Sequence, residues 1–128
     1  MTELPPFARV LGATLEQDGD GGPVLVMPFG EAVVGRPGFL HGGAIAGLLE
    51  VAAIAGLQHA LAAEGGGRIK PINITVEYRR GGREKDTRAA GVVTRLGSRV
   101  ANVEATAWQD DRANPIATAR FNFLVVRE

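Results

Sequence analysis

The sequence predicts a single α+β domain in which an antiparallel sheet surrounds one long helix. Residues 42–63 are good helix formers without a proline, and three glycines at 65–67 supply a stop signal. Residues 72–78 then alternate between apolar and polar side chains, which is typical of a strand. Because 128 residues suffice for one domain but not for two ordinary ones, we treat residues 1–128 as one domain.

Shorter elements flank the long helix on both sides. The expected elements are a short helix or turn at 4–11, strands at 14–17 and 24–28, a loop at 29–40, and further strands at 87–97, 100–109 and 116–126. Alternating apolar residues indicate the strands, and glycine-rich or polar stretches indicate the turns between them. The open edges of such a sheet favour pairing with a second copy, so we expect at least a dimer.

The long helix is rich in alanine and glycine on all sides, which permits strands to approach it closely. Its length of about twenty residues would nominally span a bilayer. Glu50 lies near its middle, however, and a central carboxylate costs about 2.5–3.5 kcal/mol on membrane-insertion scales. We therefore expect a buried helix and no membrane partner. The first residues show no signal-peptide pattern, so a cytoplasmic location is the default expectation.

The composition argues against several classes of function. Fourteen basic and fourteen acidic residues give no net charge, whereas a nucleic-acid-binding protein would normally show a basic excess. The chain has no cysteine and only two histidines, so neither a thiolate nucleophile nor a histidine-rich metal site is expected. Its one serine, Ser98, does not lie in a nucleophile elbow. We expect carboxylate, histidine or backbone chemistry, with no metal and no cofactor.

The junction between the loop and the helix carries the sequence His41-Gly42-Gly43. Glycines at a helix start leave backbone N–H groups uncovered, and the helix dipole adds about half a positive charge there. Such a corner can hold a carbonyl oxygen that gains negative charge. The alternative is structural: the glycines allow a tight turn into the helix, and His41 is a local cap.

Glu50 is an acidic residue among apolar helical neighbours, two turns into the helix. Burying an ionised carboxylate without a partner is costly, and groups in such surroundings suit the roles of general base or nucleophile. Alternatively, Glu50 points outward or pairs with Arg79 or Arg80. Residue types alone leave the two interpretations open.

These features together resemble a known family, the hotdog-fold acyl-CoA thioesterases, and most of all the branch similar to the phenylacetate-pathway thioesterase. The resemblance rests on His41-Gly42-Gly43 followed by Glu50 nine positions after the histidine, on residues 76–86 with an aromatic and then a basic, glycine-containing turn, and on residues 95–104 and 117–121. It extends from about residue 10 to residue 126. The helix-start motif with its acid at this spacing is the most specific part.

The resemblance implies a hotdog fold, dimers whose sheets join edge to edge, and tetramers built from two dimers. It implies hydrolysis of an acyl-CoA or arylacyl-CoA thioester at the subunit interface. Glu50 would be the base or the nucleophile, while the N–H of Gly43, alone or together with that of Gly42, would polarise the thioester carbonyl. His41 would order the loop and the thioester end. Coenzyme A would enter only as part of the substrate.

The chain departs from the family pattern at two positions. Gly35 stands where many relatives carry an asparagine that positions water, and Pro71 replaces a hydroxyl residue. Asn73 is the nearest polar substitute and a candidate for substrate binding. These differences leave the positioning of water open.

The remaining candidates are basic and aromatic side chains. Arg79, Arg80 and Arg83 could contact the phosphates of coenzyme A, since guanidinium groups suit bidentate phosphate contacts; a solvated hairpin tip is the alternative. His59 is expected to be structural or solvent-facing, and Tyr78 is expected to be a packing residue. Two other functions compete with thioester hydrolysis: a hydratase or dehydratase of the same fold, and a non-catalytic acyl-CoA-binding protein. The acyl group and the choice between coenzyme A and acyl carrier protein do not follow from the sequence.

Overall fold

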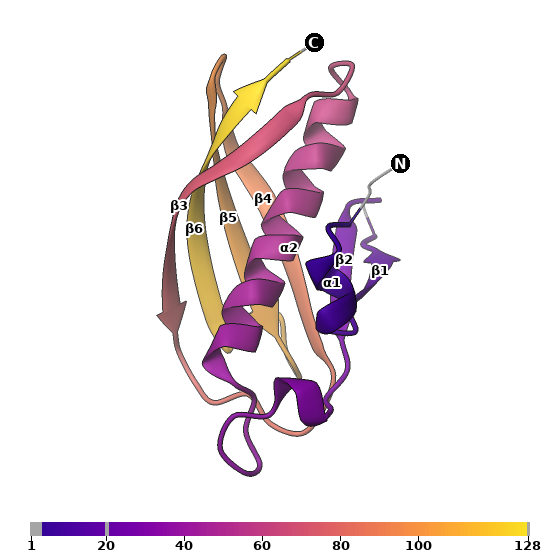
Figure 1. Ribbon diagram of the computed structural model, residues 1–128, viewed down its shortest axis with the longest axis vertical. Coiled ribbons are helices and arrows are strands. Elements are labelled where there is room, and N and C mark those ends of the chain that lie inside the picture. Colours follow the sequence, from indigo (N-terminus) through magenta and orange to yellow (C-terminus); the bar gives the residue numbers. More distant parts are fainter. Residues whose placement is uncertain (1–3, 20, 128) are drawn as a thin grey trace.

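In the computed structural model, which describes residues 4–19 and 21–127, a six-stranded antiparallel sheet curls around helix α2 (Gly42–Ala62) (Figure 1). The other elements are helix α1 (Phe7–Val10), a 3-10 turn η1 (Glu31–Val33), and strands β1 (Thr14–Gln17), β2 (Pro23–Met27), β3 (Arg68–Tyr78), β4 (Thr87–Leu96), β5 (Val100–Trp108) and β6 (Ala117–Val126). The predicted long helix and its surrounding sheet are therefore confirmed.

The strand order β1-β2-β4-β5-β6-β3 departs from the chain order at one point. After α2, the chain enters β3, which pairs with the last strand β6 and so lies at the far edge from the β1–β2 hairpin (Figure 1). β3 begins at Arg68, four residues before the predicted start, because Arg68 and its neighbours pair with the end of β6. The alternating pattern starts later than the pairing because Pro71 and a β-bulge between residues 71 and 73 interrupt it.

Helix α2 buries twelve of its 21 residues against the concave face of the sheet. Its contact with β4 is a close approach of two backbones: a Cβ added at Gly56 would lie 2.6 Å from the carbonyl oxygen of Gly91. The predicted role of the small helical residues is thus observed at this crossing. By length and composition α2 could cross a membrane, but 61% of its most apolar stretch is buried inside the molecule.

Besides the pairing of β2 with β4, two side-chain contacts join the N-terminal segment to the rest of the molecule. The ring of Phe7 lies over Gly47, where an added Cβ would come within 2.6 Å of it. The β1–β2 turn is joined to the β5–β6 turn by an ion pair between Asp18 and Arg112. The hydrogen bond from Arg112 holds the pKa of Asp18 below its usual range. The guanidinium of Arg112 also lies 4.5 Å from the ring centroid of Trp108.

The free edge of β3 is long and largely uncovered. Nine of its 11 residues are exposed, and three of them are large apolar side chains: Ile72 at 54%, Ile74 at 45% and Tyr78 at 55%. An edge strand of this length with exposed apolar residues is a template for pairing with another chain.

Candidate functional site

The start of α2 is built around His41, which is its N-cap. The backbone N–H of His41 donates to the carbonyl of Val33 at 2.8 Å, and its own carbonyl accepts the first N–H bonds of the helix. Its imidazole Nδ1 accepts a hydrogen bond from the N–H of Gly43 at 2.8 Å. The cap that the structural interpretation predicted is therefore present, and it occupies the N–H that the resemblance assigns to the thioester carbonyl.

Close contacts explain why glycines stand at this corner. A Cβ at Gly43 would lie 2.9 Å from the imidazole Nδ1 of His41, and a Cβ at Gly35 would lie 2.9 Å from the Cα of His41. The second contact is with backbone, so a side chain such as the asparagine of the resembled family pattern would require the loop to shift. At Gly42 an added Cβ would be in ordinary contact with the ring of Tyr78, at 3.5 Å.

The N–H of Gly42 makes no hydrogen bond with any other residue of 4–19 and 21–127. It belongs to the first residue of α2, where the uncovered N–H groups and the helix dipole together favour a negative charge. The helix start thus offers one open donor and a second donor that the imidazole of His41 covers.

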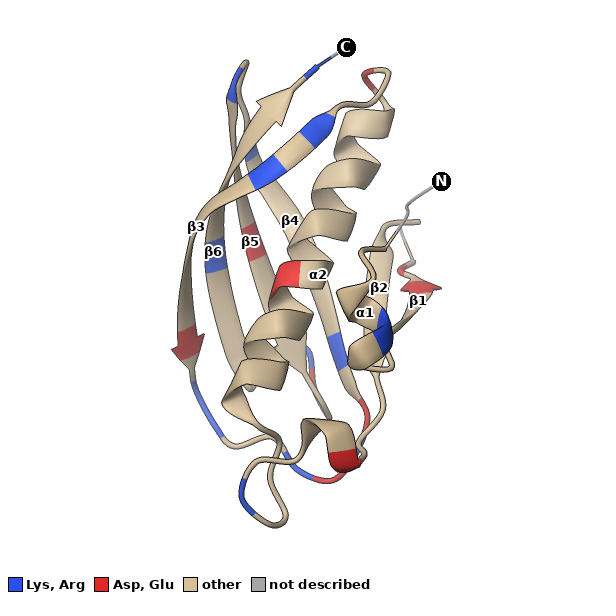
Figure 2. Cartoon of the chain, in the orientation of Figure 1, with Lys and Arg blue, Asp and Glu red and all other residues tan. Residues whose placement is uncertain are grey.

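Glu50 is the only residue of α2 that carries a formal charge (Figure 2). It is partly buried, and its carboxylate makes no hydrogen bond or ion pair with another described residue. The alternative pairing with Arg79 or Arg80 is not observed, because these arginines contact other groups. Glu50 lies seven residues after Gly43, which places it about 10 Å further along the helix axis. One water molecule does not bridge that separation within one chain.

Tyr78, at the end of β3, makes a hydrogen bond to the helix start in addition to packing against it. Its hydroxyl donates a hydrogen bond to the carbonyl oxygen of Gly42 at 2.9 Å, and its ring lies against that glycine. The sequence prediction treated Tyr78 as packing only. The one available signal was its place at the end of an alternating strand, which does not reveal a partner 36 residues away.

The three arginines of the predicted phosphate cluster diverge in the structure. Arg79 reaches the hydroxyl of Thr118 with its Nε at 3.4 Å, and Arg80 donates to the side-chain oxygen of Asn114 at 2.8 Å. Only Arg83 faces the loop before α2. The structure therefore does not bring these three guanidinium groups together.

A residue that the sequence analysis did not single out joins Arg83. The guanidinium carbons of Arg36 and Arg83 lie 4.0 and 4.3 Å from the centroid of the Phe39 ring. Neither arginine forms an ion pair with a carboxylate within the described part of the chain. Figure 2 shows basic segments in the loops beside the start of α2. A cation placed over an aromatic ring is attracted to the negative quadrupole of the ring, so the ring of Phe39 holds two positive charges beside the helix start.

Asn73 lies away from this corner. Its side-chain oxygen accepts a hydrogen bond from Asn122 at 2.8 Å, and Asn122 in turn bonds Asn102, so the three amides form a row across β3, β6 and β5. Because Phe121 and Phe123 alternate with Asn122 and fill the core, the row lies on the outer face of the sheet. Asn73 therefore lies on the opposite face of the sheet from the start of α2, and its role in substrate binding stays a prediction. Pro71 pairs with Phe123 beside the β-bulge.

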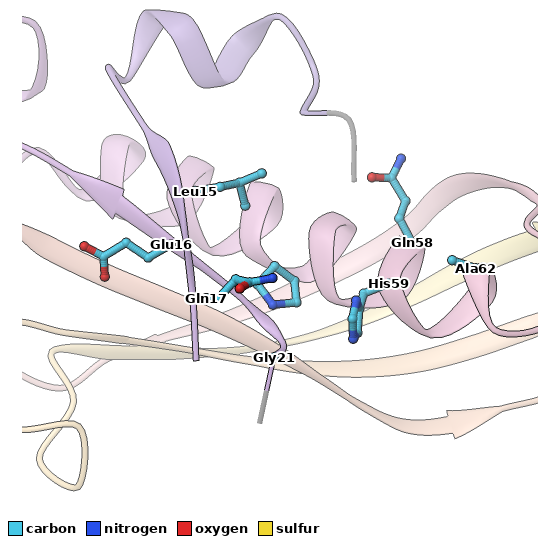
Figure 3. A pocket seen from close by; sticks show the side chains of 8 residues that line it. Leu15, Glu16, Gln17, Gly21, Gln58, His59 and Ala62 are labelled. Carbon is cyan, nitrogen blue, oxygen red and sulfur yellow. The ribbon is translucent and has the colours of Figure 1, made fainter. Parts of the chain in front are cut away.

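A separate hollow of about 390 Å³ lies between the β1–β2 hairpin and the end of α2. His59 and Gln17 face it from opposite elements (Figure 3). Neither Glu50 nor the residues of the helix start line it. This hollow is the largest of those described, but its lining does not combine an unpaired carboxylate with the N–H groups of a helix start. We therefore place the candidate site at the start of α2.

Comparison with known proteins gives one family. The sequence model of the thioesterase superfamily matches residues 37–116, which include the helix start, Glu50 and Tyr78. A search among curated proteins finds no significant match.

Three solved structures are similar to most of the chain. A protein from Chromobacterium violaceum is 32% identical, with a TM-score of 0.77, over 95% of this chain and 84% of the other. A Bacillus halodurans protein, solved with CoA, is 21% identical, with a TM-score of 0.80, over 97% and 80%. A phenylacetic acid degradation-related protein from Ralstonia eutropha is 21% identical, with a TM-score of 0.78, over 96% and 92%. The last two likenesses show the fold.

Proposed function

The chain belongs to the thioesterase superfamily and has its hotdog fold, and from this membership and the geometry of the α2 start we propose that it hydrolyses acyl-CoA thioesters to the free acid and CoA. Membership of the superfamily supports thioester hydrolysis in general. The substrate and the residues that act on it are part of the proposal. The chemistry needs water and the CoA of the substrate, and it calls for no other cofactor.

One observation carries the proposal: an unpaired, partly buried carboxylate on the same helix whose start presents N–H groups. Glu50 has no partner among the described residues, although a lone carboxylate in apolar surroundings is costly. The helix start offers the N–H of Gly42, and the N–H of Gly43 becomes available when a thioester oxygen replaces the imidazole of His41. A base and an oxyanion site are the two parts that thioester hydrolysis requires.

In the proposed reaction, the thioester oxygen accepts hydrogen bonds from the helix start while the carbonyl carbon is attacked. As a base, Glu50 takes a proton from water as the water oxygen bonds to carbon; the carbon–sulfur bond then breaks, and the CoA thiolate takes up a proton. As a nucleophile, Glu50 forms an anhydride with the acyl group, CoA leaves, and water hydrolyses the anhydride. Both routes place charge on the same thioester oxygen.

The proposed site is shared between two chains. Within one chain, Glu50 lies too far along α2 to reach the N–H of Gly43 through a single water. The free edge of β3 offers the surface for a second copy, with Ile72 and Ile74 exposed on it. We propose a homodimer in which the acid of one subunit faces the helix start of the other, with two dimers forming a tetramer.

The arginines beside the helix start support a CoA-linked substrate. Arg36 and Arg83 hold two positive charges beside the loop that leads into His41, and no carboxylate of residues 4–19 or 21–127 pairs with either of them. The similar Bacillus halodurans protein was solved with CoA, whose phosphates are anionic. In our proposal these two arginines attract the nucleotide end of CoA, and Arg79 and Arg80 contribute less because they contact Thr118 and Asn114.

The direct test measures thiol release from a panel of acyl- and arylacyl-CoAs by the wild-type protein and by Glu50→Gln. The amide keeps the size of the side chain but loses the basic oxygen, so we expect kcat to fall about 100-fold or more. Glu104→Gln is the matched control, because Glu104 is exposed on a sheet strand outside the proposed site. Wild-type rates in Glu50→Gln would overturn the mechanism.

A non-catalytic acyl-CoA-binding protein is the second candidate. It is favoured by the hydrogen bond that already occupies the N–H of Gly43 and by the close backbone contact at Gly35, where a side chain would require the loop to shift. Calorimetric binding of acyl-CoA by the wild-type protein without thiol release from any thioester of the panel would support this candidate instead.

A further inference from the structure

A chain of two hydrogen bonds runs through a single peptide group at the start of α2. The hydroxyl of Tyr78 donates to the carbonyl oxygen of Gly42 at 2.9 Å, and the N–H of Gly43 donates to the imidazole of His41 at 2.8 Å. That carbonyl and that N–H are the two ends of the same planar amide. The phenol and the imidazole are therefore connected through the amide that would meet the thioester.

A hydrogen bond donated to the carbonyl oxygen of an amide changes how strongly the N–H of the same amide donates. Amide resonance moves electron density from nitrogen to oxygen, and a hydrogen bond to the oxygen favours this shift. The N–H of Gly43 becomes more positive as a result. A carbonyl oxygen has two lone pairs, so the bond from Tyr78 is compatible with the helical bond that the same oxygen accepts.

The hydroxyl of Tyr78 does more than packing requires. The residue is 55% exposed in the single chain, so it does not fill the core of its own subunit. The contact between its ring and Gly42 would be the same with phenylalanine, and only the hydroxyl reaches the carbonyl. The bond also joins the end of β3 to the start of α2 and limits rotation of the peptide plane.

We propose that Tyr78 is a positioning residue for the reaction, which polarises and orients the amide between Gly42 and Gly43 without touching the substrate. The proposal rests on the proposed function, because it assigns the Gly43 N–H to the thioester oxygen. His41 holds this N–H while the site is empty. The thioester oxygen then takes the place of the imidazole on a donor that is already strengthened and aligned.

The test uses Tyr78→Phe, which keeps the ring and removes the donor. In the ¹⁵N-labelled protein, the amide proton resonance of Gly43 is expected to move upfield. In steady-state hydrolysis, kcat is expected to fall about two- to tenfold, the loss of one ordinary hydrogen bond, while KM stays at the wild-type value. Thr75→Val is the matched control, since it removes a hydroxyl from the outer face of the same strand and should change neither quantity.

A second measurement does not depend on a substitution by mutagenesis. Tyr78 is the only tyrosine of the chain, so biosynthetic incorporation of 3-fluorotyrosine alters this residue alone. The fluorinated phenol is more acidic and a stronger donor. At neutral pH, the Gly43 amide proton is therefore expected to move downfield, opposite to the shift in Tyr78→Phe.

The outcomes separate this proposal from the proposed function. If the Gly43 resonance and kcat stay at wild-type values in Tyr78→Phe, or if KM alone rises, the proposal is overturned. If the Gly43 resonance moves in opposite directions with phenylalanine and fluorotyrosine while the wild-type protein hydrolyses no thioester, the polarised amide is supported and the proposed function fails.

Discussion

At the scale of single residues, the site is defined by which atoms have partners and which do not. The N–H of Gly43 is covered by the imidazole of His41, whereas the carboxylate of Glu50 has no partner among the described residues. A covered donor and an uncovered acid are what a resting hydrolase would show if substrate displaces the imidazole. The two neighbouring glycines differ as well, because an added Cβ would meet the imidazole of His41 at Gly43 but the ring of Tyr78 at Gly42.

Substitution of each of the two glycines separates their roles. A methyl group at Gly43 would lie 2.9 Å from the imidazole Nδ1 and displace the side chain of His41. Because His41 is proposed to order the loop and the thioester end, we expect Gly43→Ala to fold but to lose about 10- to 100-fold in kcat/KM. Gly42→Ala has room beside the ring of Tyr78, and its melting temperature is expected to be unchanged or slightly higher. Thiol-release kinetics and thermal unfolding check the two variants; a marked loss of stability in Gly42→Ala would contradict the contacts described here.

At the scale of elements, the position of α2 depends on one close crossing with β4. At this crossing, an added Cβ on Gly91 would lie 2.7 Å from the carbonyl oxygen of Ala52, and an added Cβ on Gly56 would meet the backbone of Gly91. Larger residues would move the helix away from the sheet. Since the helix carries both Glu50 and the helix start, this crossing also sets where the proposed site lies.

The crossing predicts a reversal of the usual effect of alanine in a helix. Alanine has a higher helix propensity than glycine by about 1 kcal/mol, but at Gly56 its methyl group would overlap a backbone oxygen at 2.6 Å. We expect Gly56→Ala to lower the free energy of unfolding by about 1–3 kcal/mol, the usual cost of overpacking. Urea denaturation measures this change, with Gly42→Ala as the control helical variant. Equal or greater stability in Gly56→Ala would show that the helix and strand have space between them.

At the scale of the whole molecule, the open edge of β3 is a strand edge that has no pairing strand within the described part of the chain. Its exposed apolar residues and the distance of Glu50 from its own helix start are the two reasons for the homodimer that we propose. A site shared between chains has a consequence that a site within one chain does not have: two inactive variants can restore each other.

Subunit mixing tests this arrangement. Glu50→Gln and Gly43→Ala are refolded together in equal amounts, so that half of the dimers contain one chain of each kind. Each mixed dimer has one site with both defects and one intact site, and activity should therefore recover to about a quarter of the wild-type value. Each variant refolded alone is the control. Activity no higher than the mean of the two controls would mean that each site lies within a single chain.

Much of the fold could be predicted from local pattern. Helical composition and a glycine stop predicted α2 to within one residue, because these signals depend only on neighbours in the chain. The strand bounds of β4, β5 and β6 were likewise predicted to within one residue. Pattern did not predict that β3 crosses to the far edge to pair with β6, since alternation specifies a strand but not its partner.

Local sequence patterns identified the groups able to take part in catalysis: the helix start with His41 and two glycines, and Glu50 at its spacing from them. Which of these groups meet became visible in the three-dimensional fold. It joined Tyr78 to Gly42, brought Arg36 and Arg83 to one ring, and placed Asn73 on the outer face. The two differ because a sequence motif consists of neighbouring residues, whereas these contacts depend on strand pairing and loop packing between segments far apart in the chain.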